Sequence, residues 1–364
     1  MAVSISNTDS NLSGNTVVLE EQAATITGAY TFDRDPSAPF AVTANSAVVT
    51  NLDADKLDGQ HGTYYTSADN LSSGTIPQAR LGAPQDIGLC EGRLTLTTAT
   101  PITTSDVTAA GTIYFTPYKG NRIALYDGSS AWTVYAFTEL SLALTATSGK
   151  PYDVFIYDNS GVPTLETLVW TNDTTRATAL TTQNGILVLT GSTTRRYVGT
   201  FYASGTNQTE DSYAKRYVWN YYNRVRRPMR VLEATNTWTY TTATYRQANG
   251  STANQLDMVI GVNEVPLAAQ VTAIAENSSG NVQFRAAIGL DSTSAVATGS
   301  VTGTARPTTA GHRATATASL RTFPGVGRHF AAWLEHSAAT GTTTWIGDDG
   351  GTTDQTGIHG EIEG

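Results

Sequence analysis

Apolar and polar positions alternate along most of the chain after residue 92. The segment Arg93-Leu94-Thr95-Leu96-Thr97 places two leucines on one face of an extended strand and polar side chains on the other. Asp127-Gly128 and Asn184-Gly185 are typical turn dipeptides between such runs. Short alternating runs with this spacing predict antiparallel β-sandwiches. Further strands are expected at residues 112–116, 122–126, 132–135, 140–144, 153–157, 167–170, 186–189, 196–203, 213–231, 237–240, 255–262, 266–275, 283–289, 312–323, 330–336, 343–346 and 357–362.

Residues 1–88 follow a different pattern. Short apolar patches such as Val17-Val18-Leu19 and Phe40-Ala41-Val42 are separated by Asn, Asp, Gly and Ser. One copy of this segment has too little apolar surface to offset the entropy lost on ordering it. The segment is therefore either disordered or ordered by several copies that wind together. The one helical element expected here is a short turn over Asp53–Leu57, ended by Gly59.

The length of 364 residues is too great for one ordinary core, so two or three domains are expected. Abundant Thr, Tyr and Val favour strands, because branched and aromatic side chains fit a pleated surface. We predict an all-β chain with a thin N-terminal region over residues 1–88. One or two antiparallel, jelly-roll-like β-sandwich domains follow, over residues 89–232 and 233–364. Pro228 is expected to end or bulge the long run at 213–231, since proline cannot donate to a central ladder.

The formal net charge is −9, from 22 basic and 31 acidic residues, which disfavours binding to nucleic-acid phosphates. One basic exception runs from Arg224 to Arg230, just after the aromatic residues Trp219, Tyr221 and Tyr222. Aromatic rings followed by arginines could bind single-stranded nucleic acid, by stacking on its bases and by pairing with its phosphates. The favoured interpretation is that its arginines pair with carboxylates of a neighbouring strand or subunit, so no nucleic-acid partner is expected. The sequence shows no secretion signal and no apolar run long enough for a bilayer, so we expect no membrane insertion.

Few residues are candidates for a catalytic or metal-binding role. The single cysteine, Cys90, excludes intrachain disulfides, is expected to be structural, and fits folding in a reducing cytoplasm. A calcium loop counted from Asp53 would need Gly at its sixth position and Glu at its twelfth, where the chain has Asp58 and Tyr64. Asp348-Asp349-Gly350-Gly351 is read as a turn rather than a catalytic acid pair. His329 and His336 have odd spacing and would face opposite sides of a strand. We expect no cofactor, no metal and no enzymatic activity.

Two segments near the N-terminus carry the most specific signal. Residues 51–62 read NLDADKLDGQHG, and residues 70–81 read NLSSGTIPQARL. This pattern resembles tail-fibre and other virion-fibre structural proteins of tailed bacteriophages, and the resemblance covers roughly residues 30–82. It implies that the N-terminal region is an intertwined, oligomeric stem. The oligomerisation and attachment positions that it implies are Leu52, Asp53, Asp55, Leu57, Asp58, Gly59, His61 and Gly62.

The resemblance implies a structural virion protein, a fibre, spike or tail-associated subunit that assembles in the bacterial host cytoplasm. Its expected partners are itself, as a homotrimer, and other virion proteins of the tail, connector or capsid. A host-surface glycan is a further candidate partner. A head fibre or capsid decoration protein and a polysaccharide-degrading tailspike remain open as alternatives. The aromatic residues considered for surface contact are Trp132, Trp170, Trp219 and Trp238.

Overall fold

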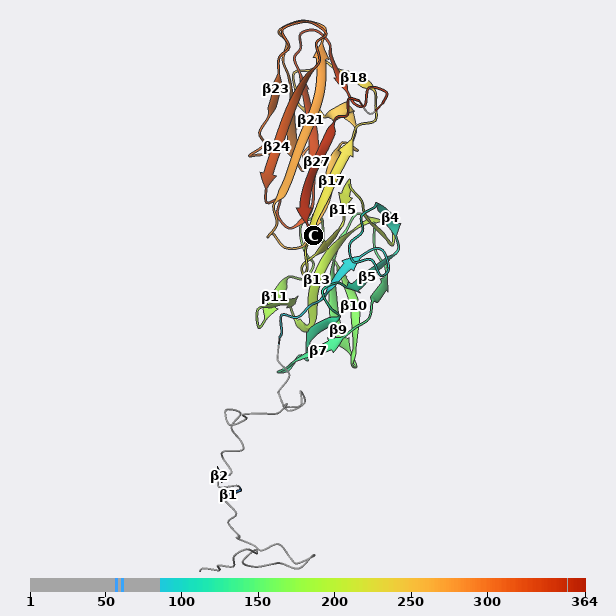
Figure 1. Ribbon diagram of the computed structural model, residues 1–364, viewed down its shortest axis with the longest axis vertical. Helices are drawn as coiled ribbons and strands as arrows, with labels where there is room; N and C mark the ends of the chain where they lie inside the picture. The colour runs from blue at the N-terminus through green and yellow to red at the C-terminus, as the bar shows by residue number, and fades with distance from the viewer. Residues whose placement is uncertain (1–55, 58–59, 62–85, 352) are drawn as a thin grey trace, which may run out of the picture. The chain divides into compact units, whose positions relative to one another are not determined.

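The computed structural model describes residues 56–57, 60–61, 86–351 and 353–364 (Figure 1). The chain divides into two compact units, Met1–Ile76 and Pro77–Gly364. In the first unit, β1 (Lys56–Leu57) pairs antiparallel with β2 (Gln60–His61). The helical turn expected over Asp53–Leu57 is therefore wrong at its last two residues, which are extended. Asp58-Gly59 separates the two strands in the sequence, and this dipeptide is a stronger signal for a hairpin than for a helix end.

The described part of the second unit is built from strands joined by turns and one 3₁₀ turn. The strands of its N-terminal half are β3 (Gly92–Thr95), β4 (Val107–Ala110), β5 (Thr112–Pro117), β6 (Arg122–Tyr126), β7 (Trp132–Ala136), β8 (Leu140–Ala143), β9 (Pro151–Asn159), β10 (Val162–Val169), β11 (Leu180–Gln183), β12 (Ile186–Leu189), β13 (Ser192–Gly205), β14 (Gln208–Asp211), β15 (Lys215–Arg216) and β16 (Val218–Asn220).

The C-terminal half continues in the same way and completes an all-β fold, as the alternating sequence pattern predicts. Its elements are β17 (Arg226–Leu232), β18 (Thr237–Tyr240), β19 (Arg246–Gln247), the 3₁₀ turn η3 (Ala248–Gly250), β20 (Gln255–Ile260), β21 (Leu267–Asn277), β22 (Phe284–Leu290), β23 (Gly303–Ala305), β24 (Ala314–Thr322), β25 (Gly327–Ser337), β26 (Thr343–Ile346) and β27 (Gly357–Glu363).

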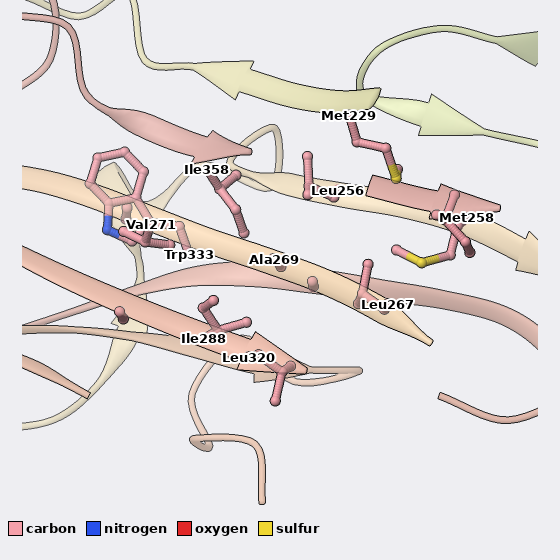
Figure 2. Close-up of a cluster of buried hydrophobic side chains, with 14 of the residues drawn as sticks. Met229, Leu256, Met258, Leu267, Ala269, Val271, Ile288, Leu320, Trp333 and Ile358 are labelled. Carbon is pink, nitrogen blue, oxygen red and sulfur yellow. The ribbon is translucent and has the colours of Figure 1, made fainter. Parts of the chain in front are cut away.

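The larger hydrophobic core lies between two sheets of the C-terminal half. In one sheet β24, β21, β27 and β17 lie side by side, and β26 pairs with the other end of β21 and with β18. The facing layer contains β20, β25 and β22. On β24 the inward positions Ala316, Ala318 and Leu320 are buried while the positions between them are exposed, because successive strand side chains point to opposite faces. Figure 2 shows this core, with side chains from both layers meeting.

A second core fills the N-terminal half. Ile113 and Phe115 of β5 pack with Val154 of β9 and Phe201 of β13. The long strand β13 pairs with β9, β12, β14 and β16 along its length. Gly199 on β13 allows β16 to approach closely, since a Cβ there would lie 2.3 Å from the carbonyl oxygen of Trp219. This sandwich and the C-terminal one confirm the expected fold class for the described residues.

The two sandwiches share backbone pairing and core. Strand β15 pairs in parallel with β20, and Tyr197 and Trp219 from the N-terminal half contribute to the C-terminal core. Strand β17 pairs along its whole length with β27, so hydrogen bonds cross the expected boundary between residues 232 and 233. The division into domains at that boundary stays a prediction.

The long strand expected at residues 213–231 is wrong, because the chain turns within it. β15, β16 and β17 are separate strands, and Asn223, between the last two, has a positive φ of 54°. The expectation for Pro228 is also wrong, since Pro228 lies inside β17 opposite Glu361. In the six-stranded sheet β17 is an edge strand, where a residue without an N–H is tolerated.

Candidate functional sites

The attachment positions implied by the phage resemblance fall mostly outside the described residues. Leu52, Asp53, Asp55, Asp58, Gly59 and Gly62 are among those outside. Leu57 and His61 are described only as backbone, in β1 and β2. Their proposed part in assembly therefore stays a prediction.

The four tryptophans considered for surface contact are buried, with exposed fractions of 6% for Trp132, 2% for Trp170, 1% for Trp219 and 9% for Trp238. The indole N–H of Trp132 donates to Asn184 Oδ1 at 3.1 Å. The side chain of Trp238 packs against two other buried indoles, with ring centroids 5.9 and 6.5 Å away. Surface contact through these residues is therefore corrected to core packing, where their large apolar area stabilises the fold most.

Trp170 also belongs to a polar cluster at the junction of the two sandwiches. The Arg176 guanidinium lies 4.3 Å from its ring centroid and donates to both carboxylate oxygens of Asp153, at 2.7 and 3.1 Å. A further N–H of Arg176 donates to the carbonyl oxygen of Gly261 at 2.6 Å. Burial raises the pKa of Asp153, and the adjacent guanidinium opposes this rise. The bidentate pair thus ties the loop after β10 to β9, and the bond to Gly261 ties the same loop to the C-terminal half.

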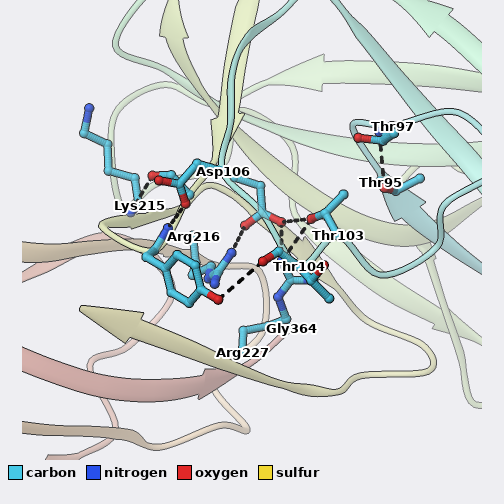
Figure 3. A network of polar contacts seen from close by, with 12 residues as sticks. Thr95, Thr97, Thr103, Thr104, Asp106, Lys215, Arg216, Arg227 and Gly364 are labelled. Carbon is cyan, nitrogen blue, oxygen red and sulfur yellow. Dashed lines mark hydrogen bonds and ion pairs between the residues drawn. The ribbon is translucent and has the colours of Figure 1, made fainter. Parts of the chain in front are cut away.

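A second buried cluster surrounds Asp211, the last residue of β14. Figure 3 labels its partners Thr103, Arg216 and Arg227. The Asp211 carboxylate accepts from Arg216 at 3.1 Å and from Arg227 at 2.7 Å. The hydroxyl of Thr103 also donates to it, at 3.4 Å. These three partners come from β15, from β17 and from the segment between β3 and β4, so one carboxylate joins parts that are far apart in the sequence. We call Asp211, Arg216, Arg227 and Thr103 the Asp211 cluster.

Arg93 on β3 is a third buried guanidinium close to this cluster. It donates to the carbonyl oxygens of Pro101 at 3.1 Å and of Gly364 at 2.8 Å. Burial, together with the nearby charge of Arg227, lowers its pKa to about 10. Pairing with backbone carbonyls satisfies its donors and fixes the last residue of the chain against the N-terminal sandwich.

Three of the arginines in the basic run at residues 224–230 contact other side chains of the protein. Arg224 pairs with Glu264 at 2.9 Å and Arg227 pairs with Asp211. Arg230 stacks on Tyr213, with its guanidinium carbon 4.5 Å from the ring centroid. Arg224 and Arg227 thus pair with carboxylates of other segments, as the favoured interpretation of the sequence expects, whereas Arg230 packs on an aromatic ring.

The acidic segment at residues 348–354 forms a turn that binds one arginine. Asp349 and Gly350 have positive φ values of 52° and 75°, and the Gly351 N–H donates to the carbonyl oxygen of Asp348 at 3.0 Å. Arg313 donates to Asp349 and to Asp354, both at 2.7 Å. Both carboxylates therefore face a cation of the protein itself, an arrangement unlike an acid pair on either side of a glycosidic bond.

The histidines and the cysteine considered as candidates for chemistry make contacts that serve the fold. His329 is buried and pairs with Asp291 at 2.8 Å, whereas His336 is partly exposed, as their odd spacing predicts. Burial raises the pKa of the Cys90 thiol to about 11, so this cysteine is a poor nucleophile. Among the described residues, no group of three or more His, Cys, Asp and Glu side chains is placed to hold a metal ion. No helix in the described ranges is long and apolar enough to cross a membrane.

The outer face of the C-terminal sandwich carries a hollow that the sequence did not indicate. Two adjoining depressions, of about 180 and 360 Å³, share the residues Ala268, Arg321 and Glu361. They follow β21, with β24 on one side and β27 on the other. We call this hollow the β21 trough. No local sequence signal marks it, because Ala268 lies between Arg321 and Glu361 only through the register of three strands.

No protein-family model and no curated protein matches the chain. Among solved structures, it is similar to the δ-endotoxin Cry8Ea1 of Bacillus thuringiensis, with 8% identity, a TM-score of 0.22, and coverage of 75% of this chain and 51% of the endotoxin. The chain thus spans about half the length of that protein. It is also similar to the stem and receptor-binding domain of the spike protein P1 of bacteriophage PM2, with 13% identity, a TM-score of 0.19, and coverage of 72% and 98%. Likeness at this level carries no argument about function.

Proposed function

We propose that the chain is a structural subunit of a tailed-bacteriophage virion, in a fibre, a spike or another tail-associated part. The observation that carries this proposal is the pair of segments NLDADKLDGQHG and NLSSGTIPQARL at residues 51–62 and 70–81. The all-β fold of the described residues agrees with it, because projecting virion parts need rigid domains. The subunit assembles in the cytoplasm of the bacterial host and becomes part of the particle.

Assembly is the main task of the N-terminal region in this proposal. Its apolar patches are too small to form a core within one chain, so copies of the region bury them against one another. Three chains wind into a stem that attaches to tail, connector or capsid proteins, and Leu52 and Leu57 lie in its seam. The β-sandwiches project from this stem and are free to touch the host surface.

A head fibre or capsid decoration protein is the first alternative, and it shares the same assembly chemistry. The second is a polysaccharide-degrading tailspike. Engagement of Asp349 and Asp354 by Arg313 speaks against a catalytic acid pair at these residues. Incubation of the protein with bacterial capsule and lipopolysaccharide is therefore expected to release no reducing sugar.

Direct location of the subunit in purified particles tests the proposal. Antibodies raised against residues 86–364 and labelled with gold should mark a projecting part of the virion in electron micrographs. Labelling at the tail supports a fibre or spike, and labelling over the head shell supports the first alternative. Particles that contain no such chain by mass spectrometry contradict the virion function itself.

A further inference from the structure

The β21 trough has Arg321 on its β24 wall and Glu361 on its β27 wall. The pairing register places Ala268 of β21 opposite Arg321 of β24 and opposite Glu361 of β27. Paired residues of antiparallel strands share a face, so these three side chains form one row across the outer surface. The next row holds Ser319, Gln270 and His359, which are all exposed. Each row thus runs from a donor-bearing side chain on β24 to a side chain on β27.

Gln270 stands in the middle of the second row, and the floor between the walls of the first row is apolar. Ala268 and Pro266 line it, and Pro228 of β17 lies beyond Glu361 in the first row. Neighbouring strands lie about 4.8 Å apart, so the two walls stand on backbones separated by about 10 Å. A space of this width above an apolar floor can hold one flat ring or chain, with its edges toward the walls.

The charged side chains of the walls have no ion-pair partner among the described residues. This holds for Arg321 and Glu361, and also for Arg226 and Glu363, which stand opposite each other at the end of the trough. Elsewhere in the described ranges, Arg176, Arg227 and Arg313 are all paired with carboxylates. The hollow therefore presents both charge signs with unused hydrogen-bonding capacity.

Three kinds of occupant fit this chemistry poorly. A peptide strand needs a free sheet edge, whereas the trough lies over β21 and β27, whose backbones are paired on both sides. A polyanion attracted by Arg321 would meet the carboxylates of Glu361 and Glu363. An apolar ligand would desolvate the charged walls without replacing their hydrogen bonds.

We infer that the β21 trough binds a neutral, linear hexose polysaccharide of the host surface. Sugar hydroxyls both donate and accept, so one ring can meet Glu361 and Arg321 with opposite edges, while its C–H face rests on Ala268. The two adjoining depressions offer places for consecutive rings along β21. This inference rests on the proposed virion function, which gives the protein a surface to recognise. Binding by the purified protein does not depend on particle assembly, so the two can fail separately.

Titration of the full-length protein with maltohexaose, cellohexaose and mannohexaose tests the inference by calorimetry. At least one of these neutral hexasaccharides should bind with a dissociation constant in the millimolar range or below. Arg321→Gln and Glu361→Gln should each weaken that binding about tenfold or more, because each removes a hydrogen bond to a charged group. Ala268→Tyr should abolish it by filling the floor.

Arg285→Gln, on β22 in the facing layer, is the matched control and should bind as the wild type does. Circular dichroism of each variant verifies that the fold is retained, which is expected because Arg321 and Glu361 are not buried. Failure of all three hexasaccharides to bind overturns the inference, and so does binding that the trough variants leave unchanged. Binding of hexagalacturonate alone, lost in Arg321→Gln, would also overturn it by showing an acidic ligand. The proposed function would survive each of these results if the chain is found in the virion.

Discussion

Replacement of Asp211 by asparagine tests whether buried ion pairs hold the two sandwiches in one unit. The side chains of Asp211, Arg216 and Arg227 are only 11%, 7% and 7% exposed. Asparagine keeps the size of the side chain and removes its charge, so two buried guanidinium groups lose their only carboxylate partner in the Asp211 cluster. Burial already lowers the pKa of Arg227, and the charge of Asp211 opposes that effect.

The expected cost follows from this burial. Removal of one partner from a buried ion pair typically lowers the free energy of unfolding by about 3–5 kcal/mol, because a charge is left buried without compensation. The control is Glu166→Gln, whose partner Arg195 is 31% exposed while Glu166 itself is 42% exposed. Loss of such a surface pair typically costs at most about 1 kcal/mol.

Urea unfolding of the full-length protein, followed by tryptophan fluorescence at one fixed protein concentration, measures both effects. Asp211→Asn should shift the midpoint to clearly lower urea, and Glu166→Gln should shift it little. Equal midpoints for the two variants would refute the reasoning, since they would show that the Asp211 cluster contributes no more than a surface pair.

Two further predictions concern pH and modularity. Burial raises the pKa of Glu335 from its ordinary 4.5 to about 7, against the lowering effects of Trp238 and Arg246. The folded state then holds this proton more tightly than the unfolded state, so the contribution to stability is complete below pH 4.5 and is lost as the pH rises to about 7. Urea midpoints of wild type minus Glu335→Gln should fall over this interval, and a flat difference would contradict the assignment. A fragment of residues 86–364 should fold alone, because Arg196 donates to the carbonyl oxygens of Ile87 and Gly88 and so anchors its start. Its circular dichroism should show β-structure, and a coil spectrum would contradict this prediction.

The strands were the most predictable part of the fold. The short apolar run at residues 122–126 gives the bounds of β6, and the alternating pattern of β24 gives both its strand and its buried face. The break in the run at 213–231 was not predictable in this way, because aromatic and branched residues favour strands on both sides of the turn at Asn223. Local preference thus identifies extended segments and does not show where the chain must reverse to complete its pairing.

Contacts between segments that lie far apart along the chain could not be predicted from the sequence. Arg93 reaches Gly364, 271 residues away, and the Asp211 cluster draws partners from three separate segments. The β21 trough likewise depends on a register that brings Arg321 and Glu361 to either side of Ala268. The burial of the four tryptophans could not be predicted either. Residue type shows that a side chain is large and aromatic, but it does not show which face of a sheet the side chain occupies.

The central claim is that residues 1–88 join several copies of this chain into one virion part. Light scattering coupled to gel filtration measures this directly when full-length protein and the fragment of residues 86–364 are compared at the same micromolar concentration. The account predicts a mass of three chains of 38.5 kDa for the full-length protein and a single chain for the fragment. A monomeric full-length protein, or a fragment that forms the same oligomer without the N-terminal region, would contradict it.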